Sequence, residues 1–372
     1  MNFLKKQSPV RIISLGFALV ILIGSVLLSL PCSIRDGVTL RYIDALYMST
    51  SAVCVTGLLT VDAGDTFTPL GQFFLGMLIQ VGGLGVTAVG TGVILAMGKK
   101  INLKARNLIR EAGNLDSGKG VIRFIRLVFL TTVTFELAGA ALSFLVFRKS
   151  FPPLKAAGVS LFHSVASFNN SGFDILGGGQ NLIPYQDDIL LNLVTCALVI
   201  FGGIGFLVIR EVIAKRFRWK KLSMHAKVVL FMSLVLTAAG TVLLKLTEDI
   251  TWMGAFFTSV SARTAGFSTF PLGSFSSAGL LTVIVLMVIG ASPGSTGGGI
   301  KTTTCYVLFE GIRSSATNTS EKAFRYAVPA DAFRKAAVIT LLAIGIVLSG
   351  TYILVILEPG VPFLDALFEM SS

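Results

Sequence analysis

Long apolar runs alternate with shorter amphipathic stretches along this 372-residue chain. Between the long runs lie three stretches of about twelve residues, "YIDALYMSTSAV", "AGVSLFHSVASF" and "TWMGAFFTSVSA". A helix needs roughly 20 residues to cross about 30 Å of hydrocarbon. The short stretches therefore predict re-entrant half-helices, and the long runs predict membrane-spanning helices at Ile12–Leu30, Pro69–Met97, Phe124–Phe147, Ile189–Ile209, Val228–Leu246, Leu280–Gly290 with its continuation, and Ala336–Leu357.

Each short stretch leads into a loop in which a small or hydroxyl residue precedes glycine and then Leu or Phe, at Gly57, Gly172 and Gly266. The order span, half-helix, glycine loop, span thus occurs three times, and repeats of this period define an architecture. The sequence predicts an all-α membrane protein of tandem repeats, with boundaries at residues 1–98, 99–221, 222–320 and 321–372. Inside the second spans, we interpret "GGLG" (82–85) and "GGIG" (202–205) as close helix packing.

A fourth repeat begins after the apolar run Ala336–Leu357. Its segment "FLDALFEMSS" is similar to "YIDALYMSTS" at 42–51, with Asp365 in the place of Asp44. By that comparison the fourth loop glycine is expected shortly after Ser372. We therefore expect this chain to be truncated within its fourth repeat, and a truncated chain alone to conduct without selectivity or not at all.

The apolar run that ends at Gly290 is followed by an interruption, Ala291–Gly299. Proline and four glycines prevent a continuous helix there, and hydroxyl groups can satisfy the freed backbone. Irregular backbone at membrane depth is tolerated only when it is buried in protein or lines a cavity. The residues of this predicted loop are Ser292, Pro293, Gly294, Ser295, Thr296, Gly297, Gly298 and Gly299, and Lys301 follows as a candidate partner.

Composition agrees with a membrane protein, since 53% of residues are hydrophobic and 13% charged, against about 25% charged in soluble domains. The net charge of +12 is concentrated in Lys5–Arg11, Lys99–Arg126, Arg210–Lys227 and Lys301–Lys335. Such alternation follows the positive-inside rule, which argues against a nucleic-acid partner and places the N-terminus in the cytoplasm. Four scattered cysteines and two histidines favour neither a metal site nor an enzyme.

The glycine loops suit backbone-carbonyl coordination of a cation. Glycine adopts positive φ readily, which lets successive carbonyls face one axis and replace the hydration shell of a monovalent ion. The loops carry almost no carboxylates, which favours potassium over calcium. The predicted filter residues, arranged with pseudo-fourfold symmetry around an ion pore, are Val55, Thr56, Gly57, Asn170, Ser171, Gly172, Thr264, Ala265 and Gly266.

Two charged residues near these loops keep alternative interpretations. Arg263 is either a pore residue or an anchor that pairs with an acid such as Asp62 or Asp174. Glu136 lies within an apolar run and is interpreted as a helix cap or an interhelix partner or, less simply, as an ion ligand.

The motifs "AVCVTGL", "NNSGFD", "ARTAGFST" and "GASPGSTGGGIKTTT" together resemble the membrane subunit of the Ktr/Trk/HKT superfamily of potassium transporters, in particular the bacterial KtrB type. The resemblance implies four span–pore–span units, a potassium filter, a homodimer in the plasma membrane, and a cytosolic nucleotide-binding regulatory subunit of the KtrA/TrkA type. It also implies that Ala291–Gly299 is an intramembrane gate, and that Gly57 favours potassium where a serine permits sodium. No bound cofactor is implied, and sodium as an activator stays open.

Two rival classes are weighed against this interpretation. A secondary cation transporter of another fold would show inverted repeats with broken helices, whereas these repeats run in the same direction. A membrane enzyme would need a nucleophile, an acid and a base that converge within the spans. Neither class accounts for the three glycine loops.

Overall fold

The computed structural model describes residues 9–86, 88–90, 92, 120–319, 322–324, 326–329 and 331–372. The fold is predominantly helical, as predicted, with one small antiparallel hairpin of strands β1 (Lys322–Ala323) and β2 (Tyr326–Ala327). The chain divides into two compact units, Met1–Gly202 and Gly203–Ser372, and each is described by itself. The predicted cytoplasmic N-terminus and most of the basic stretch Lys99–Arg126 lie outside the described residues.

Four of the described helices are long and apolar enough to cross a membrane. They are α1 (Pro9–Leu28), α7 (Val121–Phe147), α11 (Met224–Thr247) and α15 (Ala332–Leu357). Their large apolar side chains face outward in many places, with Leu130, Leu234 and Leu341 exposed by 70%, 70% and 69%. Exposed apolar faces on helices of this length are the arrangement that lipid tails require.

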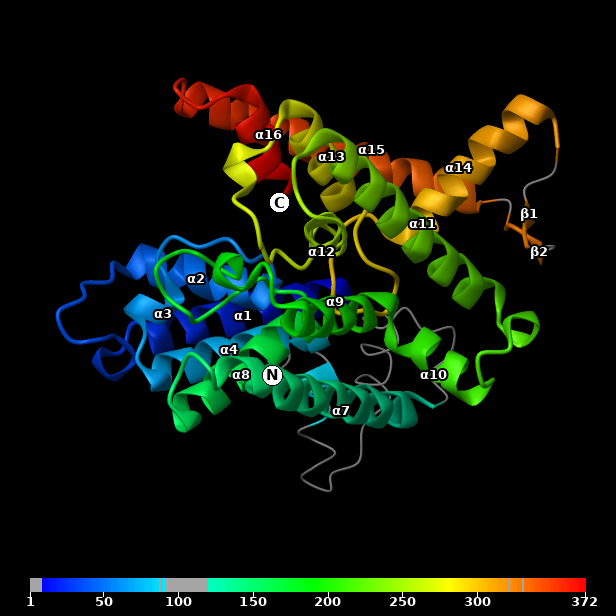
Figure 1. Cartoon of the computed structure of the whole chain (residues 1–372). Helices are drawn as coiled ribbons and strands as arrows, with labels where there is room; N and C mark the ends of the chain where they lie inside the picture. Colours follow the sequence, from blue (N-terminus) through cyan, green and yellow to red (C-terminus); the bar gives the residue numbers. More distant parts are fainter. Residues whose placement is uncertain are drawn as a thin grey trace. The chain divides into compact units, whose positions relative to one another are not determined.

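The first unit contains two span–half-helix pairs. Half-helix α2 packs against α1 and α4, and half-helix α8 lies along α7 (Figure 1). Its remaining helices are α2 (Tyr42–Cys54), α3 (Ala63–Thr66), α4 (Pro69–Leu84), α8 (Pro153–Phe168), α9 (Ile189–Ile204) and the 3-10 turns Pro31–Ser33 and Ile183–Tyr185.

The second unit follows the same order, with half-helix α12 packed on α11 and α13, and α16 packed on α15 (Figure 1). Thr251 caps α12, because its side chain accepts a hydrogen bond from the Gly254 N–H. The remaining helices of this unit are α10 (Phe206–Ala214), α12 (Trp252–Ala262), α13 (Ser277–Val288), α14 (Thr302–Thr317), α16 (Phe363–Ser371) and the 3-10 turns Trp219–Lys221 and Leu272–Ser274.

One contact between half-helix and preceding span occurs three times. A buried serine on the half-helix donates a hydrogen bond to a backbone carbonyl of the span, and a glycine one turn further along the span leaves room for that serine. A Cβ on that glycine would lie 2.4, 2.5 and 2.4 Å from the serine Oγ. The sets of serine, carbonyl residue and glycine are Ser49, Ile21 and Gly24; Ser164, Glu136 and Gly139; and Ser259, Thr237 and Gly240.

The pair α15–α16 repeats this arrangement with a different side chain. A Cβ on Gly350 of α15 would lie 2.1 Å from Met370 Cε of α16. Met370 follows Asp365 by five residues, just as Ser49 follows Asp44. The alignment of "FLDALFEMSS" with "YIDALYMSTS" therefore has a structural counterpart.

The second span of each repeat is interrupted, which corrects part of the sequence interpretation. Helix α4 ends before Gly85 and α9 ends before Gly205, and these glycines have φ of +84° and +99°. The first glycines of GGLG do serve close packing, since a Cβ on Gly82 would lie 2.2 Å from the Val53 carbonyl oxygen. The last glycine of each motif instead ends the helix, because other residues rarely adopt this backbone conformation.

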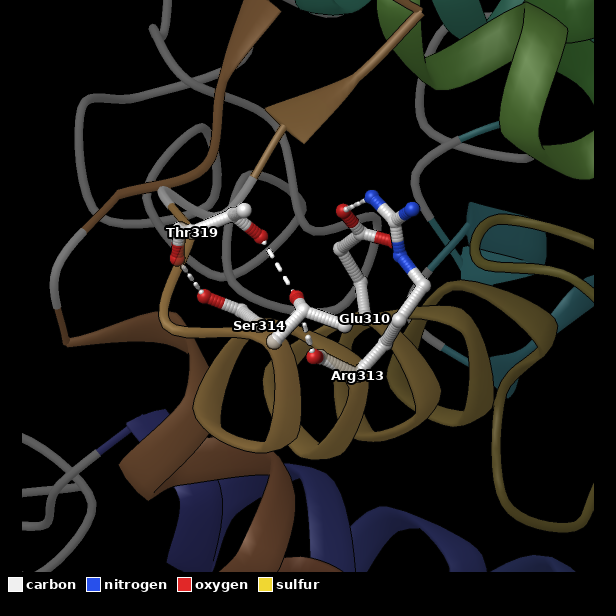
Figure 2. Close-up of polar contacts among 5 residues, drawn as sticks. Glu310, Arg313, Ser314 and Thr319 are labelled. Atoms are coloured by element: carbon white, nitrogen blue, oxygen red, sulfur yellow. Dashed lines mark hydrogen bonds and ion pairs between the residues drawn. The ribbon is translucent and has the colours of Figure 1, made fainter.

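The far end of α14 is held by a small polar network, shown in Figure 2. Arg313 pairs with the buried Glu310 through two contacts, of 2.6 and 3.0 Å. Ser314 accepts a backbone bond from the Thr319 N–H and donates its hydroxyl to the Thr319 carbonyl oxygen. The segment after α14 is thereby fixed to the last turn of the helix, which begins directly after the predicted gate.

Candidate functional site

The three predicted filter loops share one backbone geometry. In each loop the first residue is left-handed, with φ of +56° at Val55, +57° at Asn170 and +78° at Thr264. The glycine two residues later is left-handed again, with φ of +82°, +71° and +82° at Gly57, Gly172 and Gly266. Alternating left-handed residues turn successive carbonyls toward one side of the chain, the arrangement that coordination of a dehydrated cation needs.

Each loop is also joined to its half-helix by backbone bonds from the loop's N–H groups. Thr56 N–H donates to the Ser51 carbonyl, Ser171 N–H to Ala166, and Ala265 N–H to Ser261, at 2.8, 2.9 and 2.8 Å. These N–H groups are thus used between each loop and its half-helix, and the Gly172 carbonyl of the second loop accepts a hydrogen bond from the Asn181 side-chain amide at 3.2 Å. The half-helix also directs its C-terminal partial negative charge toward the loop.

In the first unit two of these loops lie side by side. A Cβ on Gly57 would lie 2.4 Å from the Ser171 carbonyl oxygen and 3.6 Å from Gly172 Cα. Glycine is therefore required at 57 for two reasons, its positive φ and the close approach of the second loop. The structure thus brings Gly57 of the first loop against Ser171 and Gly172 of the second.

In the second unit, the third loop is closed by Ser261. Its hydroxyl donates to the Phe267 carbonyl oxygen at 2.6 Å, and the Gly266 N–H donates to the Ser261 carbonyl at 3.2 Å. Thr264, Ala265 and Gly266 form the same turn as the other two loops.

Arg263 has partners that the sequence interpretation did not name. Its guanidinium donates to the Ser233 carbonyl oxygen at 3.2 Å and lies 3.4 Å from Thr237 Oγ1, both on α11. The suggested partners Asp62 and Asp174 are bonded within their own unit. Within the second unit, Arg263 thus joins the end of its half-helix to the preceding span α11.

An acidic cluster connects two outer loops of the first unit. Asp65 accepts the Gly178 N–H at 2.8 Å, and Asp62 accepts the Gly179 N–H at 2.7 Å. Asp174 lies two residues after Gly172, and its carboxylate accepts the Leu176 N–H at 3.0 Å and the Asn181 side-chain amide at 3.2 Å. These bonds hold the segment that follows the second filter loop.

Asp174 is expected to make stability pH-dependent. Burial raises the pKa of the Asp174 carboxyl to about 6, the charges of Asp62 and Asp65 act in the same direction, and the Leu176 N–H opposes them. The folded state therefore binds the proton more tightly, and the free energy of unfolding falls by about 2–3 kcal/mol as pH rises from about 4 to about 6. We expect Asp174→Asn to remove that decline.

The measurement is thermal unfolding of the detergent-solubilised protein between pH 4.5 and 7.5, read as the difference between wild type and variant. Asp187→Asn, which changes an exposed carboxylate of the same loop, is the matched control and should give a difference that is constant with pH. A difference for Asp174→Asn that is equally constant would contradict the prediction.

The predicted gate loop is irregular backbone, as expected, and it is closed on itself. The Ala291 N–H donates to the Gly298 carbonyl at 3.0 Å, and the Ile300 N–H donates to the Val288 carbonyl at 3.1 Å. Two hydroxyls serve freed groups, because Ser295 Oγ donates to the Ser292 carbonyl at 2.6 Å and Ser292 Oγ bonds Thr302 Oγ1 at 2.9 Å. The loop residues Pro293, Gly294, Thr296, Gly297 and Gly299 lie within this turn.

The predicted gate loop is also bonded to residues 203–206, with which the second unit begins. The Ser292 N–H donates to the Gly203 carbonyl, and the Phe206 N–H donates to the Gly294 carbonyl, both at 3.0 Å. A Cβ on Gly205 would lie 2.7 Å from the Pro293 carbonyl oxygen. The end of the GGIG motif therefore contacts the predicted gate loop, and the interpretation of this motif as close helix packing missed that contact. The final glycine of the motif is the feature of the sequence that could have indicated it.

Lys301 fixes the C-terminal end of the gate loop. Its ammonium donates to the Gly297 carbonyl oxygen at 2.7 Å and lies 3.4 Å from the Gly298 carbonyl oxygen. The Lys301 ammonium thereby satisfies backbone carbonyls of this irregular segment. Within the described residues, no group of three or more histidine, cysteine or acidic side chains could hold a resident metal ion.

Comparison with known proteins gives consistent matches. The family described as "TrkH: Cation transport protein" matches residues 17–372. The chain is 35% identical to Ktr system potassium uptake protein B of Bacillus subtilis strain 168, over 98% of this chain and 84% of that protein. It is 38% identical to potassium/sodium uptake protein NtpJ of Enterococcus hirae, over 82% of this chain and 69% of that protein.

A solved structure has the same fold. The crystal structure of the potassium transporter TrkH from Vibrio parahaemolyticus aligns with a TM-score of 0.71 and 20% sequence identity, over 95% of this chain and 74% of that one. This likeness concerns the fold alone.

Proposed function

The chain belongs to the TrkH family of cation transport proteins, and on that premise we propose that it is the ion-translocating membrane subunit of a potassium uptake system. It is a membrane-embedded transport protein and not an enzyme. The observation that carries the proposal is the alternating left-handed geometry shared by all three glycine loops. Packing alone requires no such recurrence.

In this proposal potassium moves along the backbone carbonyls of Val55–Gly57, Asn170–Gly172 and Thr264–Gly266. Carbonyls of this kind replace water around a monovalent ion, and the two serine hydroxyls Ser171 and Ser261 are used internally to support their loops. Sodium is proposed as an activator or secondary ion, supported by the printed name of the Enterococcus relative.

The gate is proposed to be Ala291–Gly299. Its support is the irregular backbone of the segment, its bonds to Gly203 and Phe206, and the Lys301 contact. We further propose a homodimer in the plasma membrane with a cytoplasmic N-terminus, controlled by a cytosolic nucleotide-binding subunit. The naming of two relatives as parts of a Ktr system supports a multi-component assembly.

A transport assay tests the proposal. The full chain, expressed from its complete gene in a bacterial strain without its own potassium uptake, is expected to restore growth at low potassium and to take up labelled rubidium. Potassium in excess should compete with rubidium, whereas calcium should not. Growth that is unchanged by a chain shown to reach the membrane would contradict the proposed function.

A further inference from the structure

The residue three positions before each loop glycine lies at the end of its half-helix, at Cys54, Asn169 and Arg263. In the second repeat the side chain of this residue donates a hydrogen bond to the side chain of Glu136, and in the third repeat to that of Thr237. Glu136 and Thr237 lie on the preceding spans, and their backbone carbonyls are the ones that accept the hydrogen bond from the half-helix serine. The same place behind the filter loop is thus used for a polar anchor in two repeats.

The anchor of the second repeat is fully buried. Asn169 is 0% exposed and Glu136 is 8% exposed. Asn169 Nδ2 lies within hydrogen-bond distance of Glu136 Oε1 at 3.1 Å, Gln80 Oε1 at 3.1 Å and the Val165 carbonyl oxygen at 2.9 Å. Burying a carboxylate in a membrane protein costs free energy unless the carboxylate has hydrogen-bond or charge partners. The contact between Glu136 and Asn169 therefore restricts the position of the loop that follows Asn169.

Asn169 is covered on its other side by α4. A Cβ on Gly83 would lie 2.2 Å from Asn169 Oδ1 and 2.7 Å from its Cγ. The side chain can occupy its position only because residue 83 is glycine. Asn169 is directly followed by Asn170, Ser171 and Gly172, so a shift of its side chain moves the first carbonyls of the loop.

We infer that Glu136 and Gln80 are positioning residues of the second filter loop, acting through the side chain of Asn169. The inference rests on the proposed function and deepens it, since it assigns the selectivity of that loop to a contact behind it. Glu136 holds Asn169 by accepting a hydrogen bond, and does not itself bind the ion. Arg263, bonded to Ser233 and Thr237, does the corresponding work in the third repeat.

The test compares Glu136→Ala, Glu136→Gln, Asn169→Ala and Ser143→Ala in the full chain, in the uptake assay above with increasing sodium. Ser143 is a buried residue on the same helix, and no hydrogen bond reaches its Oγ among the described residues, which makes it the matched control. Two readouts are taken for each variant, the sodium-to-potassium uptake ratio and the midpoint of thermal unfolding.

We expect Glu136→Ala and Asn169→Ala each to raise relative sodium uptake about tenfold, because a buried hydrogen-bond partner is lost. Glu136→Gln keeps an acceptor oxygen, so its ratio should stay within about twofold of wild type, and Ser143→Ala should leave it unchanged. If the Glu136→Ala protein does not accumulate in the membrane, Asn169→Ala still tests the inference, because it removes the same hydrogen bond from the other side.

Three outcomes would overturn the inference. A lower unfolding midpoint with an unchanged uptake ratio would make the anchor merely structural. Equal loss in Glu136→Gln and Glu136→Ala would show that charge, not the hydrogen bond, matters. Wild type that takes up no potassium would overturn the proposed function itself, which separates that failure from failure of the anchor alone.

Discussion

Gly57→Ser is expected to lower the preference for potassium over sodium by about tenfold or more. A non-glycine residue in a sparsely populated region costs of order 1–3 kcal/mol, and Gly57 has φ of +82°. The new Cβ would also lie 2.4 Å from the Ser171 carbonyl oxygen, so one of the two loops must move. Since 1.4 kcal/mol is about tenfold in an equilibrium constant, even partial movement is measurable as a change in the sodium-to-potassium uptake ratio.

Gly37→Ser is the matched control for this substitution. Gly37 has φ of +81°, and a Cβ there would meet no atom of the described residues within 4 Å. The control therefore carries the same backbone strain without a clash against a filter loop. If Gly57→Ser and Gly37→Ser leave the uptake ratio equally unchanged, Gly57 has no part in selectivity.

Removal of Ser295–Gly297 from the proposed gate loop is expected to raise potassium flux by roughly 5- to 30-fold and to weaken control by the proposed cytosolic partner. The deletion removes the Ser295 hydroxyl bond and the Gly297 carbonyl that accepts from Lys301. Two such hydrogen bonds contribute about 1 kcal/mol each, which corresponds to that range of flux when they hold the closed state. Rubidium uptake with and without the partner measures both effects.

Two single substitutions test independently whether the contact between Gly205 and Pro293 holds the proposed gate loop in place. Gly205→Ala places a Cβ 2.7 Å from the Pro293 carbonyl oxygen. Gly85→Ala, at the corresponding break of the first repeat, places a Cβ with no atom of the described part of the chain within 4 Å. Both glycines have positive φ. We expect higher flux in Gly205→Ala than in Gly85→Ala. Equal flux in these two variants, together with unchanged flux after the loop deletion, would reduce Ala291–Gly299 to a simple interruption of the span.

Periodicity and length alone located the half-helices well. The stretch "YIDALYMSTSAV" became α2, and "TWMGAFFTSVSA" became α12 with a threonine cap at its start. The interruption at Ala291–Gly299 was equally visible, because proline and glycine act locally on the backbone. Helix ends and interruptions depend on residues that are close in sequence, so one sequence is enough to predict them.

Contacts between segments distant in sequence were not predictable in the same way. The packing interpretation of GGIG treated Gly205 as a small residue in a helix, but its positive φ ends α9 and brings the chain to the gate loop. Burial and hydrogen-bond partners depend on which helix comes to lie opposite, and no local pattern encodes this.

The candidate site likewise combines local features, which the sequence predicts, with contacts between distant segments, which it does not. The filter tripeptides were chosen from a repeated glycine, and their shared backbone geometry is a property of each short loop. Asn169 stands in the motif NNSGFD without a predicted role, and Glu136 has only an unspecified predicted partner. Their contact joins α7 to the end of α8, and Gln80 adds α4, so it exists only after three helices have packed.

The recurring serine contact has a consequence for how the protein is made. The hydroxyl bonds of Ser49, Ser164 and Ser259 join residues separated by 28, 28 and 22 positions in the chain. Contacts this local close small loops and form quickly. Each hairpin of span and half-helix can therefore assemble as soon as it leaves the ribosome and enters the lipid, before the following one has been synthesised.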